Sequence, residues 1–157
     1  MKEQEKFMRE AIRLSVENVE SRRGGPFGAV VVKNGEIIAS AANEVTTSND
    51  PTAHAEVVAI RKACERLGTF RLDNCEIYCS CEPCPMCLGA IYWARLAKLF
   101  FANSKADAAE IHFDDKFIYK EIDKSIEKRK LPTEQLLREE AQHAFLLWQI
   151  SSNKTEY

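Results

Sequence analysis

Residues 75–94 read CEIYCSCEPCPMCLGAIYWA, and this stretch decides the fold. Cys75 to Ser80 predicts a strand, Pro85 to Ala94 predicts a helix, and Leu96 to Ala102 predicts a second, buried strand. Two strands joined through a crossover helix run parallel, and the crossover is right-handed in nearly all known folds. The stretch therefore predicts an α/β protein.

The residues just upstream repeat this unit. Pro51 and Thr52 predict the start of a helix, and Gly68 predicts its end. The apolar positions between them, at helical spacing, are Val57, Ile60, Cys64 and Leu67. The order strand, helix, strand, helix, strand implies two crossovers, with helices on both faces of the sheet. This order predicts a three-layer α/β/α sandwich.

The N-terminal part of the chain predicts a helix and a hairpin. Residues 2 to about 22 carry apolar side chains at helical spacing, and the pattern stops at Gly24-Gly25-Pro26. Strands are expected at residues 27–32 and 36–42. They are joined at Asn34-Gly35, a dipeptide typical of a type I′ hairpin turn. The sheet is therefore expected to begin with an antiparallel pair.

The C-terminal part has a weaker pattern. Residues 106–122 mix acidic and basic side chains, as on a solvated surface, and Pro132 breaks the chain. A terminal amphipathic helix is predicted from Leu136, Leu137, Ala141, Phe145, Trp148 and Ile150. No basic patch is evident there.

Length and charge narrow the class of protein. With 157 residues, 45% of them hydrophobic, the chain is expected to form one domain over residues 1–157. A formal net charge of -2 offers no positive field for DNA or RNA, so a small uncharged substrate is favoured over a nucleic acid. No apolar run approaches the roughly 20 residues of a membrane span, and the charged N-terminus does not resemble a signal peptide. A soluble, cytoplasmic protein is expected.

One histidine and two cysteines form a candidate metal site. His54 opens the first crossover helix, and Cys84 and Cys87 open the second. Both helices start at the carboxyl edge of the sheet, so the three side chains are expected to meet there. An imidazole and two thiolates can hold one Zn²⁺ and leave the fourth position to water, whose pKa falls toward neutrality. Glu56, two residues after His54, is the candidate for proton transfer. The set points to hydrolysis.

Two other interpretations of the cysteines stay open at this stage. A Cys-x-x-Cys beside a strand and a helix also occurs in thioredoxin-like dithiols. Cys81 could instead complete a closed Cys₃His shell, which would make the zinc site structural. The position of Cys81 at the end of the strand argues against this. The remaining cysteines, Cys64, Cys75 and Cys79, are expected to pack in the core.

Six short motifs stand out along the chain: HAE (54–56), CEPCPMC (81–87), GPFGAV (25–30), NEVT (43–46), SNDPTA (48–53) and FDDKFIY (113–119). Together they resemble the motifs of the cytidine deaminase superfamily, and in particular those of its bacterial guanine deaminases. The resemblance implies a five-stranded mixed sheet with its fifth strand near Thr133 to Leu137. It also implies conversion of guanine and water to xanthine and ammonia at one zinc ion per subunit. Finally, it implies a homodimer in which the segment of about 131–157 can exchange between subunits.

The resemblance also implies substrate contacts. It assigns Asn43 to the purine edge, Phe27 to a pocket wall, and Ala55 and Trp93 to further contacts. From sequence alone, Phe27 and Trp93 are expected in the core. The final residue, Tyr157, is a terminus by sequence, and the family pattern places it in the site of a partner subunit.

Guanine presents a ring N–H beside its amine, and an acceptor-only carboxylate matches these two donors. Asp115, or else Asp114, is therefore expected to read this edge and to assist proton transfer.

Three alternative functions remain. A transfer-RNA adenosine deaminase shares the zinc motif but needs phosphate contacts, against which the acidic balance and the FDD segment at 113–115 argue. Guanosine is a second alternative substrate, because a pocket that is open on the ribose side would admit the nucleoside. A non-catalytic module stabilised by zinc is disfavoured by Glu56 and by the three-ligand shell. The expected partner is a small purine base, with no nucleic acid and no membrane.

Overall fold

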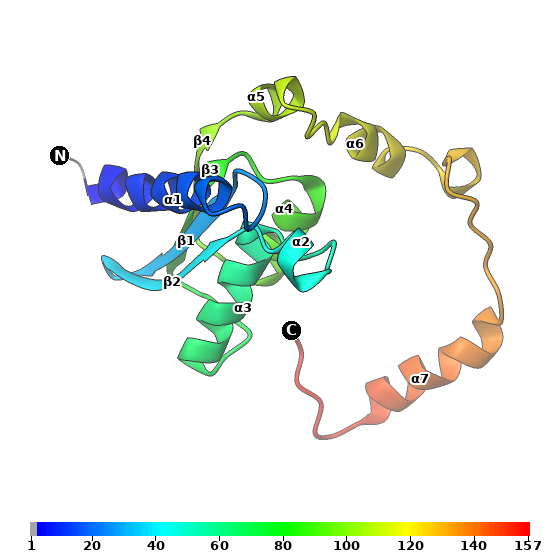
Figure 1. The fold of residues 1–157 in the computed structure, drawn as a ribbon. Coiled ribbons are helices and arrows are strands. Elements are labelled where there is room, and N and C mark those ends of the chain that lie inside the picture. Colours follow the sequence, from blue (N-terminus) through cyan, green and yellow to red (C-terminus); the bar gives the residue numbers. More distant parts are fainter. Residues whose placement is uncertain (1–2) are drawn as a thin grey trace. The chain divides into compact units, whose positions relative to one another are not determined.

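The computed structural model describes residues 3–157, which contain one sheet of four strands flanked by helices (Figure 1). The strands are β1 (Gly28–Lys33), β2 (Glu36–Ala42), β3 (Cys75–Cys81) and β4 (Lys98–Asn103). They lie in the order β2-β1-β3-β4, with β1 antiparallel to β2 and β3, and β3 parallel to β4. Strands β2, β3 and β4 therefore share one direction, and the sheet is mixed, as predicted.

The predicted hairpin is confirmed. Strands β1 and β2 pair from Lys33 opposite Glu36 to Gly28 opposite Ala42. The turn residues Asn34 and Gly35 have φ angles of 52° and 80°. Both values are positive, as a type I′ turn requires.

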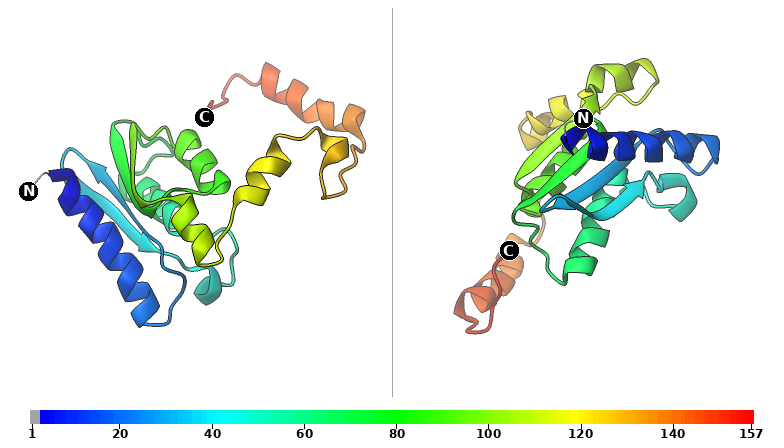
Figure 2. Two further views of the ribbon diagram at one scale, coloured as in Figure 1. Left: turned by 90° about the horizontal axis from the view of Figure 1, so that it is seen from above. Right: turned by 90° about the vertical axis from the view of Figure 1, so that its left-hand side faces the viewer.

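Helices cover both faces of the sheet. The helices of the described chain are α1 (Glu3–Glu20), α2 (Val45–Ser48), α3 (Ala55–Leu67), α4 (Pro85–Trp93), α5 (Lys105–Glu110), α6 (Lys116–Ile122) and α7 (Arg138–Ile150), with a 3-10 turn η1 (Ile126–Lys128). Helix α1 lies on one face and α3 on the opposite face (Figures 1 and 2). The three-layer sandwich is thus confirmed. Within residues 3–157, no helix has the length and apolar character needed to cross a membrane.

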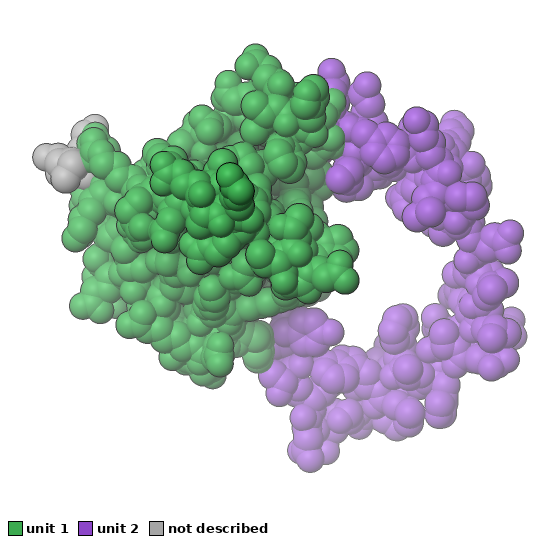
Figure 3. Space-filling model, in the orientation of Figure 1, with its two compact units in different colours: residues 1–115 green, residues 116–157 purple. Residues whose placement is uncertain are grey.

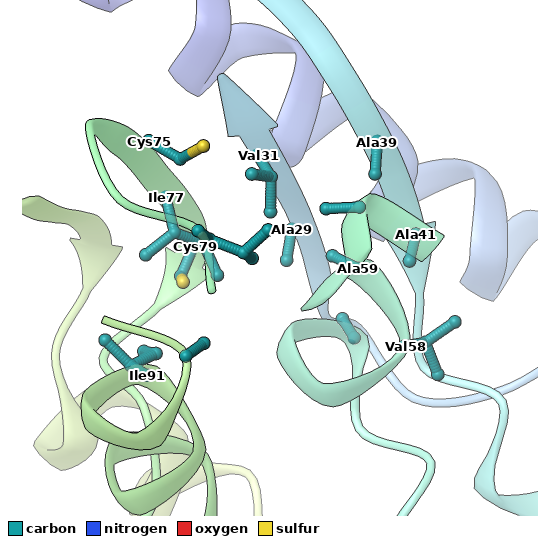
Figure 4. Packing of buried hydrophobic residues seen from close by; sticks show 14 of the residues in the cluster. Ala29, Val31, Ala39, Ala41, Val58, Ala59, Cys75, Ile77, Cys79 and Ile91 are labelled. Atoms are coloured by element: carbon teal, nitrogen blue, oxygen red, sulfur yellow. The ribbon is translucent and has the colours of Figure 1, made fainter. Parts of the chain in front are cut away.

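Alternation along the strands divides the buried residues into two cores. On one face, Val30, Val32 and Tyr78 pack with Phe7 and Ala11 of α1. The other face holds a larger cluster between the sheet, α3 and α4 (Figure 4). Its labelled members are Ala29, Val31, Ala39, Ala41, Val58, Ala59, Cys75, Ile77, Cys79 and Ile91. Because successive side chains of a strand point to opposite faces, one sheet supports both cores. The predicted core positions of Cys75 and Cys79 are confirmed, and Cys64 packs partly buried against the larger cluster.

Helix α3 begins later than predicted. The Asp50 carboxylate accepts hydrogen bonds from the backbone N–H of Thr52 at 2.8 Å and from its hydroxyl at 2.7 Å. The N–H of Ala53 also donates to the carbonyl of Asp50 at 3.1 Å. These bonds close a turn over the residues where the helix was expected. The first helical residue is therefore Ala55, and His54 becomes the N-cap.

The expected fifth strand is absent from residues 3–157. The chain from Thr133 to Leu137 forms no ladder with another strand, and Leu136 and Leu137 are exposed. A strand is defined by backbone bonds to a neighbouring strand, and one segment cannot supply these bonds alone. The expectation of five strands is therefore wrong for this single chain, whereas the class of fold is confirmed.

The chain divides into two compact units, Met1–Asp115 and Lys116–Tyr157, which Figure 3 colours separately. The first unit holds the sheet and both cores. The second holds α6, η1 and α7, and none of its residues is buried. The assignment of residues 1–157 to one domain stays a prediction.

Candidate active site

Two helix N-termini bring the candidate ligands together at one edge of the sheet. His54 is the N-cap of α3, and Cys84 is the N-cap of α4, with Pro85 as the first helical residue. Both N-caps have extended backbones, and neither side chain makes a capping hydrogen bond. An N-cap side chain usually accepts such a bond. These two side chains instead face each other, with His54 Nδ1 and Cys84 Sγ 3.6 Å apart.

His54, Cys84 and Cys87 form a small triangle. The Nδ1 atom of His54 lies 3.6 Å from Cys84 Sγ and 3.5 Å from Cys87 Sγ, and the two sulfurs are 3.5 Å apart. Tetrahedral zinc with ordinary bond lengths would place sulfur and nitrogen about 3.6 Å apart, and two sulfurs about 3.8 Å apart. Among residues 3–157, this trio is the group whose ligand atoms converge closely enough to hold a metal ion. The triangle fits one zinc ion.

The charges of the trio also fit a cation. The hydrogen bond between the sulfurs lowers the pKa of Cys84 to about 4 and, with burial, raises the pKa of Cys87. The hydrogen bond with Cys84 raises the pKa of His54, although burial opposes it. Without a cation, one thiolate is stable and the second is not. A divalent ion would stabilise both thiolates and a neutral imidazole, which is the usual donor set for zinc.

Glu56 lies next to the triangle but outside the ligand group. Glu56 is 8% exposed, and burial raises the pKa of its carboxyl. Hydrogen bonds with its own backbone N–H and with Cys87 lower this pKa and partly oppose the effect of burial. A buried carboxyl with a raised pKa holds and releases a proton nearer neutral pH than an exposed one does.

Cys81 does not join the trio. It is buried, and its thiol donates a hydrogen bond to the backbone carbonyl of Ser104 at 3.6 Å. Burial, together with the charge of Glu56, raises its pKa to about 11, which favours the neutral thiol. The group of converging ligands in the described chain therefore has three members, as a zinc site that keeps a position for water requires.

Backbone hydrogen bonds join Asn43 to Phe27, and join Glu44 to the residue before His54. The N–H of Asn43 donates to the carbonyl of Phe27 at 3.0 Å, and the N–H of Glu44 donates to the carbonyl of Ala53 at 2.9 Å. Ala53 immediately precedes His54. Asn43 is 8% exposed, whereas Phe27 is half-buried and meets the Phe113 ring edge-on at 5.0 Å. Both residues thus lie within the first unit, and Phe27 packs against the core cluster that contains Ala53 and Ala55.

The two neighbouring aspartates have different surroundings. Asp114 is exposed, and Asp115 is partly buried. Desolvation raises the pKa of Asp115, and the negative charge of Cys84 adds to this effect. Asp115 therefore senses the candidate ligands electrostatically. Ala55, the first residue of α3, is fully buried beside His54.

The remaining two predicted residues lie elsewhere. Trp93 ends α4 and is 64% exposed, so the expectation that it belongs to the core is wrong. Trp93 lies on the exposed side of α4, whereas Ile91 is the residue of this helix that packs into the core. Tyr157 belongs to the second unit and is 72% exposed. Its relation to the triangle stays a prediction.

Sequence reasoning missed Asn18. This residue of α1 is 2% exposed and donates hydrogen bonds from Nδ2 to the carbonyls of Gly25 and Asn43. A signal was present, because Asn18 continues the spacing of Phe7 and Ala11 along the buried side of the helix. A polar residue on such a face requires a partner, and here the partners lie next to the candidate site.

The family follows from a match that includes the triangle. The model of the cytidine and deoxycytidylate deaminase zinc-binding region matches residues 1–103, which contain all three candidate ligands. This chain therefore belongs to the zinc-binding cytidine and deoxycytidylate deaminase family.

Individual relatives narrow the comparison. Guanine deaminase of Bacillus subtilis is 58% identical over 153 residues, which cover 98% of each chain. An X-ray structure of guanine deaminase from the same species has a TM-score of 0.95, again covering 98% of both chains. A guanine deaminase structure from Nitrosomonas europaea has a TM-score of 0.66 and 34% identity, covering 69% of this chain and 63% of that one. The tRNA-specific adenosine deaminase of Bacillus subtilis is 45% identical over 101 residues, 64% of this chain and 62% of the relative.

Proposed function

We propose that this protein is a zinc-dependent guanine deaminase, which hydrolyses guanine to xanthine and ammonia. The observation that supports guanine as the substrate is the 58% identity to a guanine deaminase over 98% of both chains. The observation that supports the chemistry is the three-ligand triangle with a buried carboxyl beside it. We assign His54, Cys84 and Cys87 as the zinc ligands and Glu56 as the group that transfers protons.

Zinc, when bound, supplies a Lewis acid that lowers the pKa of a water molecule at its open position. The Glu56 carboxylate takes one proton from the attacking water, and the water oxygen forms a bond to C2 of guanine. The protonated carboxyl then gives this proton to the ring nitrogen N3. The carboxylate next moves the second water proton to the amine. The bond from C2 to the amine breaks, so the amine leaves as ammonia and the ring becomes xanthine.

Asp115 is proposed to read the side of guanine that carries the amine. Guanine presents the N1–H and the C2 amine as adjacent donors, and a carboxylate accepts from both. Desolvation of Asp115 strengthens any hydrogen bond that its carboxylate accepts there. The charge of Cys84 raises the pKa of Asp115, which supports a place near the zinc ligands. Asp114 is the second candidate, without this support.

Asn43 is proposed to hold another edge of the purine. The backbone N–H of Val45 donates to Asn43 Oδ1 at 3.3 Å. This bond orients the side chain and leaves the amide N–H₂ group to donate to a ring acceptor. Phe27 is proposed as an apolar wall for the purine, Ala55 as a backbone contact at the start of α3, and Trp93 as an outer contact.

The second unit supports the proposal of a homodimer. Its helix α7 has no buried residue, and Phe145 and Ile150 are 68% and 79% exposed. The other large apolar side chains of α7 that are exposed are Leu146, Leu147 and Trp148. A helix with so many exposed apolar side chains is typical of an interaction surface. We propose that residues of about 131–157 exchange between two subunits and that Tyr157 then reaches the partner's site. The protein is proposed to act in the cytoplasm on a free purine base and not on nucleic acid.

The test uses the full-length, zinc-loaded protein and measures ammonia release. The substrates are guanine, guanosine, adenine, cytosine, cytidine and an RNA stem-loop with adenosine in its loop. Appreciable turnover is expected with guanine alone. Turnover of guanosine instead of guanine would identify the nucleoside as the substrate. Turnover of the RNA would indicate the activity of a tRNA adenosine deaminase. Full zinc occupancy with no reaction on any substrate would indicate a non-catalytic zinc module.

A further inference from the structure

Asn18 is a buried polar residue for which the proposed zinc chemistry has no use. It lies on α1, on the side of the helix that faces the sheet, and is 2% exposed. Another buried polar residue of this helix, Ser15, donates its hydroxyl to the carbonyl of Ile12, within its own helix. Asn18 instead donates from its side chain to two segments outside the helix. It therefore connects parts of the chain that Ser15 does not touch.

The two acceptors belong to different segments. Asn18 Nδ2 lies 2.9 Å from the carbonyl oxygen of Gly25, in the loop after α1, and 3.0 Å from that of Asn43, just after β2. A primary amide nitrogen has two N–H groups, so both bonds can form at once. One side chain thus joins the loop after α1 to the end of β2.

Gly24 allows these segments to approach each other. A Cβ atom on Gly24 would lie 2.6 Å from the carbonyl oxygen of Asn43 and 2.9 Å from Asn18 Nδ2. The first distance involves a backbone atom, which cannot rotate out of the way. Any side chain on Gly24 would therefore push the end of β2 away from the loop.

The joined segments carry two of the proposed substrate contacts. The carbonyl of Gly25 also accepts a hydrogen bond from the N–H of Phe27 at 2.8 Å, and the carbonyl of Phe27 accepts one from the N–H of Asn43 at 3.0 Å. The two side-chain bonds of Asn18 therefore close a ring of hydrogen bonds through Gly25, Phe27 and Asn43. A shift at Asn18 would displace the purine wall and the purine edge contact together.

We propose that Asn18, with Gly24, is a positioning element that sets the affinity of the site for guanine without touching the substrate. The inference rests on the proposed function. Loss of Asn18 should weaken substrate and transition state equally, because Asn43 and Phe27 contact parts of the purine that do not react. Such a loss raises KM and leaves kcat nearly unchanged. The zinc ligands start α3 and α4, which Asn18 does not contact through its side-chain hydrogen bonds.

The experiment compares Asn18→Ala and Gly24→Ala with Ser15→Ala. The last is a matched control, since it also removes a side-chain hydrogen bond of a buried residue of α1 but leaves the two segments joined. Guanine KM and kcat, the Kd of xanthine by calorimetry, zinc content and Tm are measured for each full-length protein. Asn18→Ala and Gly24→Ala are expected to raise KM and the Kd of xanthine at least tenfold. Their kcat should stay within threefold and their zinc content at one per chain.

Ser15→Ala is expected to lower Tm with KM within twofold of the wild-type value. The inference is overturned if Asn18→Ala and Gly24→Ala keep a wild-type KM, or if they lower kcat and leave KM unchanged. Gly24→Ala, on a partly exposed loop, decides the matter alone if Asn18→Ala does not fold. An inactive wild-type protein would instead refute the proposed function. The xanthine measurement distinguishes this failure, because it needs no turnover.

Discussion

Glu56 and His54 are separated by one residue at the start of α3, and this spacing separates their tasks. Two residues correspond to about 200° around a helix, so the side chains of His54 and Glu56 cannot both point at the metal in the same way. Glu56 instead meets the Cys87 thiol, and the pKa of its carboxyl is raised by burial. This arrangement suits a group that exchanges a proton beside the ion without coordinating it.

Replacement of Glu56 by Gln tests this role. The Gln side chain has almost the same shape but cannot take up the proton, so kcat for guanine should fall about a thousandfold. Zinc content, measured by elemental analysis, should remain at one ion per chain because the ligands are unchanged. A variant that keeps more than a tenth of the wild-type kcat would show that another group transfers the proton.

The neighbouring aspartates Asp114 and Asp115 allow a second test at the level of single residues. Asp115→Asn replaces one acceptor oxygen with a donor against the donors of guanine, so kcat/KM should fall at least tenfold. Asp114→Asn, its matched control on the exposed neighbour, should stay within twofold. Steady-state kinetics at constant zinc content provide the comparison. The opposite order would assign the contact to Asp114, and near-native rates in both variants would remove the carboxylate from the proposal.

At the scale of helices and strands, turns and caps decide where side chains arrive. The Asp50 turn delays α3 until Ala55, and this delay makes His54 an N-cap whose ring faces the cysteines. Pro85 starts α4 directly after Cys84. Each ligand position is therefore the result of where a helix begins, and the large core between the sheet and these helices holds both starts in place.

The hairpin turn gives a prediction on stability alone. Gly35 has a φ of +80°, so Gly35→Ala should lower the free energy of unfolding by about 1–2 kcal/mol. Asn34→Gly, at the neighbouring positive φ, removes a Cβ and should change stability by less. Urea denaturation measures both, and KM for guanine should not change because the turn carries no proposed contact. Equal stability of Gly35→Ala and wild type would contradict the type I′ assignment.

At the scale of the whole molecule, the two units differ in how they are stabilised. Residues 3–115 contain both cores, whereas no residue of the second unit is buried within one chain. Burial of apolar area is the main favourable contribution to folding, so the second unit needs a surface to cover it. We expect a second subunit to provide that surface.

Mixed dimers test the exchange of the C-terminal segment. One chain carries Glu56→Gln and the other lacks Tyr157, with different affinity tags to isolate the mixed dimer. If the segments exchange, the site with an intact Glu56 receives Tyr157 from its partner and shows the wild-type KM for guanine. A dimer that joins wild type to a chain with both changes is the control, and there the intact site should show a raised KM. The reverse pattern would mean that each tail serves its own subunit.

Local patterns in the sequence determined the core of this protein. The hairpin at Asn34-Gly35 and both crossover helices could be predicted, because spacing over a few residues encodes them. The meeting of His54 with Cys84 and Cys87 could also be predicted, because both crossover helices start at the same edge of the sheet. The late start of α3 could not, since it depends on the bonds that Asp50 makes in the folded turn.

Only the tertiary structure decided the rest. It separated Cys81 from the ligands, left Trp93 outside the core and joined Asn18 to Asn43 across 25 positions of sequence. These outcomes depend on contacts between residues far apart in the chain, and no local spacing encodes such contacts. The fifth strand expected near Thr133 belongs to the same class, because a strand exists only where another backbone lies alongside it.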